Sequence, residues 1–118
     1  TGEGSVTPYH DHGGEVVWQI GTGYFGCRDA DGKFLMKKLL ETVQRYPQIR
    51  AIEIKLSQGA KPGAGGILPK SKITPEIAEI RGIPSNRDCI SPASHPAFHD
   101  ADSLLDFAES IAAEPPPA

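Results

Sequence analysis

The two predicted strands are the most regular hydrophobic segments of the chain. Residues 15–20 form a short run rich in β-branched and aromatic side chains between two glycines, which predicts a strand. Residues 51–56 alternate with a period of two, which predicts a second strand. Its apolar face consists of Ile52, Ile54 and Leu56. Its polar face carries Glu53 and Lys55. In an open sheet these two residues would lie on a solvated edge, whereas in a closed barrel they would lie in the interior.

Two amphipathic helices are predicted from apolar residues that recur at steps of three and four. The first covers residues 33–46 and stops at Pro47, because proline cannot continue a helix. The second begins near Asp100 or Asp102 and runs to Ala113. A proline run then ends all order, so we expect one folded unit over residues 1–113 and a disordered, proline-rich tail over residues 114–118.

A shorter helix is predicted from the residues at its ends. Thr74 supplies a capping hydroxyl, Pro75 suits the first helical position, and Glu76 places a carboxylate near the positive end of the helix dipole. Gly82 closes the helix after Arg81. The order strand, helix, strand, loop, helix, helix predicts an α/β protein with parallel strands joined by crossover helices.

Glycine and proline are unusually frequent and are concentrated in two places. The chain has 13 glycines and 11 prolines among 118 residues, whereas the usual share of the two together is roughly 12%. Seven glycines fall between Gly2 and Gly26 and four between Gly59 and Gly66. Shaped loops of this kind often carry sites, so both segments are candidates.

The charge balance excludes several classes of partner. With 12 basic and 15 acidic residues the net charge is -3 and the pI about 5.7. This argues against nucleic-acid binding and against a polybasic membrane surface. No run approaches the roughly 20 apolar residues of a membrane span, and no signal peptide is visible, so we expect a soluble, cytoplasmic protein. Cys27 and Cys89 belong to no metal or redox motif, so we expect reduced thiols.

The loop that follows the second strand offers unusual chemistry. Lys55, Gln58 and Lys61 lie among glycines that leave backbone N–H groups accessible, an arrangement that suits an anion or a flat, electron-rich ring. The spacings of a nucleotide P-loop and of a dinucleotide fingerprint are both absent. The alternative is a tight turn with solvated lysines. Arg81 either stabilises the end of its helix or binds a carboxylate through two parallel hydrogen bonds.

A histidine-rich segment suggests a metal site as an alternative. His10, Asp11 and His12 are ligand types for transition metals, and His95 and His99 add two more imidazoles. Histidines cluster readily in polar loops, and a structural or solvated role explains them more simply. We therefore predict no metal ligands. The alternative hypothesis is a metal site formed by His10, Asp11 and His12.

Four ordered blocks of sequence resemble the FMN-binding synthase domain of glutamate synthases. They are TGEG at 1–4, QIGTGYFG at 19–26, IEIKLSQGAKPG at 52–63 and CISP at 89–92. The similarity runs from Thr1 to about Ala108. The family fold is a (β/α)8 barrel, which needs about 250 residues. The resemblance therefore implies an incomplete segment of such a barrel.

The resemblance also implies roles for the residues of these blocks. Lys55 would lie near the pyrimidine edge of FMN, where an ammonium stabilises the anionic reduced ring, and Gln58 and Gly59 would contact the same cofactor. Glu3 would act with Lys55 as a catalytic residue and would orient the substrate together with Thr22.

The substrate residues implied by the family are Lys61 and Arg81, which match positions that bind the carboxylates of 2-oxoglutarate. Ala64 and Ile67 stand where the family usually has an acid and an amide. The predicted function is therefore part of an FMN-dependent oxidoreductase acting on 2-oxoglutarate, 2-iminoglutarate or a related keto acid. The parent protein is predicted to be an enzyme, and this chain alone to be inactive. The alternative is a non-catalytic, oligomerising α/β module that has lost the cofactor-binding half.

Overall fold

The fold is an α/β arrangement with one parallel strand pair. The computed structural model describes residues 1–57 and 65–113. The elements are a 3-10 turn η1 (Pro8–His10), strand β1 (Val16–Ile20), helix α1 (Met36–Arg45), strand β2 (Ile49–Ile54), strand β3 (Ile67–Leu68), a 3-10 turn η2 (Lys70–Lys72), helix α2 (Pro75–Arg81), strand β4 (Cys89–Ile90) and helix α3 (Ala101–Ala112).

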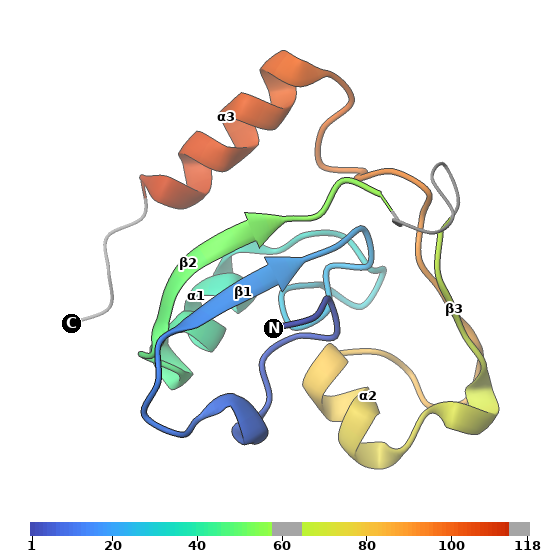
Figure 1. The fold of residues 1–118 in the computed structure, drawn as a ribbon. Coiled ribbons are helices and arrows are strands. Elements are labelled where there is room, and N and C mark those ends of the chain that lie inside the picture. Colours follow the sequence, from blue (N-terminus) through green and yellow to red (C-terminus); the bar gives the residue numbers. More distant parts are fainter. Residues whose placement is uncertain (58–64, 114–118) are drawn as a thin grey trace.

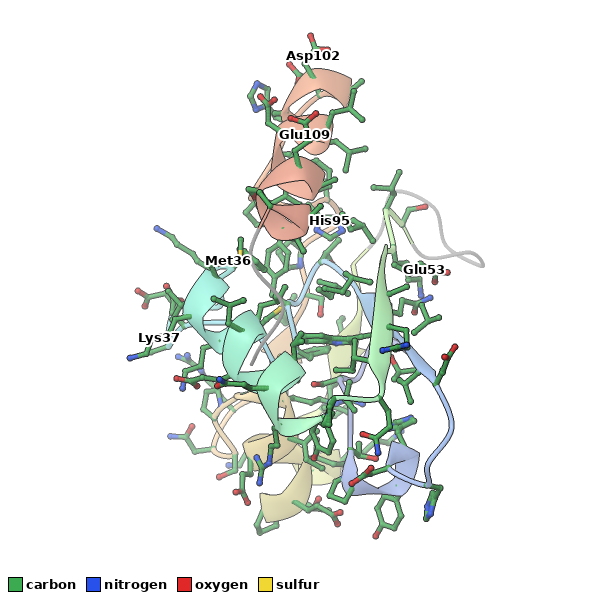
Figure 2. All side chains as sticks on the ribbon, turned by 90° about the vertical axis from the view of Figure 1, so that its left-hand side faces the viewer. Met36, Lys37, Glu53, His95, Asp102 and Glu109 are labelled. Atoms are coloured by element: carbon green, nitrogen blue, oxygen red, sulfur yellow. The ribbon has the colours of Figure 1, made fainter. Side chains whose placement is uncertain are left out.

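The β1–β2 pair is the centre of the fold. The two strands are parallel, with Trp18 opposite Ile52 and Ile20 opposite Ile54. Helix α1 connects them and covers one face of the pair (Figure 1). Figure 2 shows Met36 of α1 and Glu53 of β2 on opposite sides of the sheet. The period of two predicted for the second strand is thus confirmed, with the apolar face toward the helix.

The main core fills the space between the strand pair, α1 and α3. Its buried members are Val6, Trp18, Ile20, Tyr24, Cys27, Leu39 and Phe107. Trp18 and Tyr24 are fully buried, and aromatic side chains dominate the contact with α3. Burying such large side chains supplies most of the driving force for folding. Cys27 and Cys89 are buried free thiols, as predicted.

A second, smaller cluster lies around the antiparallel β3–β4 pair and α2. Phe25, Ile73, Ile83 and Cys89 form its buried part. Sequence analysis did not predict β3 and β4, since each contains two residues and a period of two is invisible at that length. Ile67 pairs with Ile90, and both side chains are largely exposed.

The predicted helices are confirmed with small shifts at their ends. Thr74 accepts a hydrogen bond from the Ile77 amide and Asp100 accepts one from the Ser103 amide, so both predicted caps are formed. The first helix begins at Met36 rather than Lys33. No helix within residues 1–57 and 65–113 combines the length and apolar character that a membrane crossing requires. The predicted tail, residues 114–118, lies outside the described residues.

One detail of the second strand was wrong. Leu56 was predicted to lie within the strand, on the same apolar face as Ile52 and Ile54, but β2 ends at Ile54 and Leu56 is 53% exposed. The alternation therefore continued in the sequence for two residues beyond the strand.

A buried histidine lies beside the aromatic core. His95 is 3% exposed, stacks on Phe98 with a centroid distance of 4.7 Å and packs edge-on against Tyr24. Burial lowers the pKa of His95 below its ordinary value of 6.5, partly opposed by a hydrogen bond to the carbonyl of Lys55. Burial raises the pKa of Tyr24 to about 12, so its hydroxyl stays protonated at neutral pH.

The low pKa of His95 predicts a loss of stability in mild acid. The unfolded chain takes up a proton at this histidine near pH 6.5, while the folded chain resists it until lower pH. The free energy of unfolding should therefore fall as the pH drops below about 6.5, with a slope of up to about 1.4 kcal/mol per pH unit for this one group. Urea unfolding at pH 7.5 and 5.5 measures this difference.

The matched control for this prediction is His99, whose side chain is 85% exposed. The variant His95→Gln should flatten the dependence on pH, and His99→Gln should leave it as in the wild type. An equal dependence in the wild type and His95→Gln would contradict the prediction.

Candidate functional site

The carboxyl ends of β1 and β2 bring the predicted site residues into one region. Ile20 and Ile54 are register partners at the ends of the two strands. The Lys55 amide donates a hydrogen bond to the Ile20 carbonyl at 2.9 Å, so the parallel register extends one residue beyond β2. In parallel α/β proteins, ligands bind outside these ends of the strands. Lys55 thus occupies the position expected of a binding residue.

Lys55 and Glu3 form an ion pair at this end of the sheet. The Lys55 ammonium lies 2.8 Å from the Glu3 carboxylate, and the two side chains are 27% and 29% exposed. Both groups are half-buried, so their attraction is screened less than that of a surface pair. A cation held beside a carboxylate and still reached by solvent can bind a polar, electron-rich group.

The Glu3 side chain packs closely against Gly21, the residue that follows β1. A Cβ atom on Gly21 would lie 3.1 to 3.4 Å from three atoms of the Glu3 side chain. This spacing is tighter than ordinary van der Waals contact, so a larger residue would press on the carboxylate. The glycine-rich block therefore lets the segment that carries Glu3 pass closely over the strand end.

The N-terminal segment links the ion pair to Arg81. Thr1 lies along the outer edge of β1, where its hydroxyl accepts a hydrogen bond from the Gln19 amide at 3.0 Å. Gly4 lies against the guanidinium of Arg81, because a Cβ atom there would be 2.8 Å from a guanidinium nitrogen. Glu3 and Gly4 are adjacent, so this segment brings Lys55 and Arg81 to the same side of the molecule.

Arg81 is the last residue of α2, and its guanidinium covers an aromatic ring. The guanidinium carbon lies 4.9 Å from the centre of the Phe25 ring, a cation–π distance. The Arg81 carbonyl also accepts a hydrogen bond from the Gly26 amide at 3.1 Å. Arg81 is therefore held by its backbone and by its side chain.

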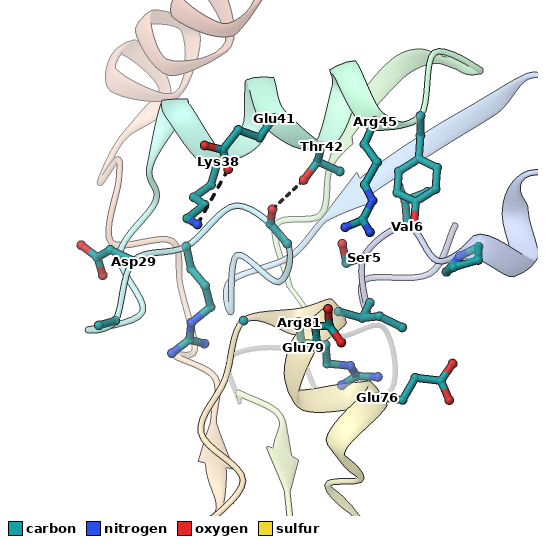
Figure 3. Close-up of a pocket in the computed structure, with 17 residues that line it drawn as sticks. Ser5, Val6, Asp29, Lys38, Glu41, Thr42, Arg45, Glu76, Glu79 and Arg81 are labelled. Carbon is teal, nitrogen blue, oxygen red and sulfur yellow. Dashed lines mark hydrogen bonds and ion pairs between the residues drawn. The ribbon is translucent and has the colours of Figure 1, made fainter.

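Arg81 lines a cleft between α1 and α2 with a volume of about 530 Å³. Figure 3 shows the two helices facing each other across it, with Arg81 and Glu79 on α2 and Thr42 on α1. Charged side chains of both signs line the cleft, namely Arg28, Lys38, Arg45 and Arg81 with Asp29, Glu41, Glu76 and Glu79. Of the predicted site residues that the structure describes, only Arg81 contributes to its lining.

Thr22 follows the end of β1 and is 7% exposed. Its hydroxyl donates a hydrogen bond to the Pro92 carbonyl at 2.6 Å. The hydroxyl proton is thus engaged with the protein, and the oxygen lone pairs are the part that can accept a hydrogen bond. Gln58, Gly59 and Lys61, the other predicted site residues, lie outside the described residues.

His95 was not predicted as a site residue, although it contacts Lys55. Its Nε2 atom lies 2.6 Å from the Lys55 carbonyl oxygen, and its Nδ1 atom lies 2.9 Å from the Tyr24 hydroxyl. Both ring nitrogens are therefore hydrogen-bonded to the protein, so neither is available to bind a metal ion. The sequence carries no local signal for these contacts, since the partners are 40 and 71 residues away.

The histidine cluster near the N-terminus has structural partners. His10 closes the turn η1, where its Nδ1 atom accepts a hydrogen bond from the Thr7 amide at 2.9 Å. Asp11 accepts one from the Gln48 side chain at 2.5 Å. Within residues 1–57 and 65–113, no three histidine, cysteine, aspartate or glutamate side chains are grouped closely enough to hold a metal ion.

Comparison with known proteins gives the same region a family context. The conserved region in glutamate synthase matches residues 1–113, which includes every described helix and strand. Two similar proteins are the archaeal glutamate synthase [NADPH] of Methanocaldococcus jannaschii, 42% identical over 115 residues, and the glutamate synthase large subunit-like protein YerD of Bacillus subtilis, 38% identical over 112 residues. Each alignment covers 94% of this chain, and 19% and 21% of the two relatives respectively.

A third relative is the ferredoxin-dependent glutamate synthase of Cyanidium caldarium, 47% identical over 96 residues that cover 81% of this chain and 5% of that protein. The chain thus spans about a fifth or less of the length of these relatives. The family match covers Glu3, Thr22, Lys55 and Arg81, which are the predicted site residues that the structure describes. On this match, which extends over nearly the whole chain, the protein belongs to the glutamate synthase family.

Proposed function

We propose that this chain supplies part of the active site of an FMN-dependent oxidoreductase of the glutamate synthase type. The substrate would be 2-oxoglutarate, 2-iminoglutarate or a related keto acid. The observation that carries the proposal is the Lys55–Glu3 ion pair, 2.8 Å long and half-buried at the carboxyl ends of two parallel strands. The names of the relatives support the reaction class.

The donors at the strand ends suit the polar edge of a flavin. Flavin supplies the electron transfer when bound, and the protein supplies binding, orientation and charge. The ammonium of Lys55 donates hydrogen bonds and a positive charge, and its partial exposure leaves it accessible to a ring edge. The close passage at Gly21 keeps bulky side chains away from this end of β1. Gln58 and Gly59 are proposed as further cofactor contacts from the sequence resemblance.

Recognition of a keto acid would fall to Arg81 and Lys61. A guanidinium fork binds a carboxylate through two parallel hydrogen bonds, which an ammonium cannot reproduce. Stacking on Phe25 restricts the guanidinium before any ligand arrives, which lowers the entropy lost on binding. Glu3 and the acceptor lone pairs of Thr22 are proposed to orient the reacting end of the substrate.

The same proposal includes the architecture of the parent protein. The succession of β1, α1 and β2 corresponds to one strand–helix–strand repeat of a (β/α)8 barrel, with residues 1–113 as one barrel segment. A complete barrel needs about 250 residues and eight parallel strands. Side chains on the face away from α1, including Glu53 and Lys55, would then point toward the barrel interior.

An apolar groove supports a second candidate function, that of a non-catalytic, oligomerising α/β module. The groove lies between β2 and α3, has a volume of about 390 Å³ and is lined largely by aliphatic side chains. This function predicts that the purified 118-residue chain is colourless and multimeric. Absorbance near 450 nm together with size-exclusion chromatography tests this, and a yellow monomer would exclude the second candidate.

Replacing Lys55 with methionine tests the cofactor role. In the full-length protein, Lys55→Met keeps much of the side-chain stem and removes the charge, so flavin should bind but become harder to reduce. One partly exposed charge near the ring is worth about 1–2 kcal/mol. The midpoint potential, measured by spectroelectrochemical titration, should fall by the corresponding amount.

The control for this variant is Lys37→Met, which removes an exposed lysine of α1 that does not line the cleft with Arg81. It should leave the flavin potential unchanged. A wild-type potential in Lys55→Met would exclude the proposed role of Lys55.

Replacing Arg81 with lysine tests the substrate role. The variant Arg81→Lys keeps the charge and loses the two parallel hydrogen bonds, so binding of 2-oxoglutarate should weaken about tenfold, or about 1.4 kcal/mol. Titration of the oxidised full-length protein measures this change. Arg50→Lys is the control, since Arg50 lies near the start of β2, at the opposite end of the strand. Equal affinities in Arg81→Lys and the control would contradict the assignment.

A further inference from the structure

The backbone of Lys55 is held from both sides. Its amide donates to the Ile20 carbonyl at 2.9 Å, which continues the β1–β2 pairing. Its carbonyl oxygen lies 2.6 Å from the Nε2 atom of His95. β2 ends one residue earlier, at Ile54. His95 therefore provides a hydrogen bond to Lys55 just beyond the end of the strand.

The contacts of His95 determine which ring nitrogen carries the proton. A carbonyl oxygen can only accept, so Nε2 must be protonated and donate to Lys55. In the neutral ring Nδ1 is then an acceptor, and the Tyr24 hydroxyl donates to it at 2.9 Å. The Tyr24 oxygen in turn accepts a hydrogen bond from the Ala97 amide at 3.2 Å. The series of bonds thus runs in one direction, from Ala97 through Tyr24 and His95 to Lys55.

This series is buried within the core. Tyr24 is fully buried and His95 is 3% exposed, so water does not compete freely for their hydrogen bonds. Phe98 stacks on the imidazole, and Phe107 of α3 packs against both Phe98 and Tyr24. Figure 2 shows His95 between the end of α3 and the strand pair. The position of the imidazole is consequently fixed by the packing of Tyr24, Phe98 and Phe107.

We propose that His95, oriented by Tyr24, is a positioning residue that fixes the Lys55 peptide and so holds the Lys55 ammonium in place beside Glu3. This inference rests on the cofactor role proposed above for Lys55. Without the donor at Nε2, the Lys55 carbonyl would lose this hydrogen bond, and the backbone just beyond the end of β2 would be held less firmly. The direction of the Lys55 side chain follows the orientation of its backbone.

The first experiment measures amide hydrogen exchange at Lys55 in the full-length protein. His95→Leu removes the donor and keeps an apolar side chain, whereas His95→Gln retains an N–H donor at about the position of Nε2. We expect exchange at Lys55 to accelerate about fivefold in His95→Leu beyond any change at Ile52, the factor that corresponds to one hydrogen bond. His95→Gln should restore most of the protection.

Tyr24→Phe provides a second variant if His95→Leu fails to fold. It keeps the aromatic ring and removes only the hydroxyl that orients the imidazole, so it should accelerate exchange at Lys55 in the same direction. Thr42→Val is the matched control, because it removes a hydrogen bond of similar type, from the Thr42 hydroxyl to the Gly26 carbonyl at 2.9 Å. This control should affect Lys55 and Ile52 equally.

The second experiment measures the flavin midpoint potential in a double-mutant cycle. His95→Leu should lower the potential in the same direction as Lys55→Met, and His95→Gln should recover it toward the wild-type value. In the Lys55→Met background, His95→Leu should have no further effect, because both changes act through the same ammonium. A purely structural role for His95 would leave the potential unchanged in both backgrounds.

The two experiments distinguish failure of this inference from failure of the proposed function. Unchanged exchange at Lys55 in His95→Leu and Tyr24→Phe, or a potential change that is fully additive with Lys55→Met, overturns the positioning role. A wild-type potential in Lys55→Met overturns the cofactor role of Lys55, and with it the functional part of this inference. If amide exchange at Lys55 were still accelerated in that case, His95 would stabilise the Lys55 backbone without any role in flavin reduction.

Discussion

The parallel pairing of β1 with β2 is the constraint on which the other features of the molecule depend. It places Ile20 beside Ile54 and so puts the residues that follow both strands at one edge. It also aligns Trp18 and Ile52 on the face that α1 covers, where the buried aromatic core forms. Adjacent parallel strands need a crossover connection, which is usually a helix. Helix α1 provides this connection and also covers one face of the strand pair.

The edge formed in this way is completed by segments from elsewhere in the chain. The N-terminal segment brings Glu3 to Lys55 and Gly4 to Arg81, so a cation at a strand end and a cation at a helix end lie on the same side. Close passage at Gly21 and Gly4 is what permits this. Gly4 and Gly21 are thus explained by contacts with charged side chains, a specific geometric requirement that general loop flexibility does not impose.

The position of Lys55 illustrates how a core and a site depend on one another. The imidazole that contacts its carbonyl is buried among aromatic rings, and this burial lowers its pKa. A packed core is hardly compressible, so the groups attached to it are held with little freedom. A binding residue at a strand end, which would otherwise be mobile, acquires a fixed backbone in this way.

The sequence by itself determined the kinds of element and their order. The alternation at residues 51–56, the period of residues 33–46 and the cap at Thr74 are local signals, and each led to the correct element because neighbouring residues decide such structure. The location of Lys55 before a glycine loop also followed from the sequence. Only the tertiary structure decided that Glu3 pairs with Lys55, that Arg81 lies over Phe25 and that His95 reaches the Lys55 carbonyl. These partners are far apart along the chain, and their meeting depends on how the strands pair and how the core packs, for which no local pattern of residues gives a signal.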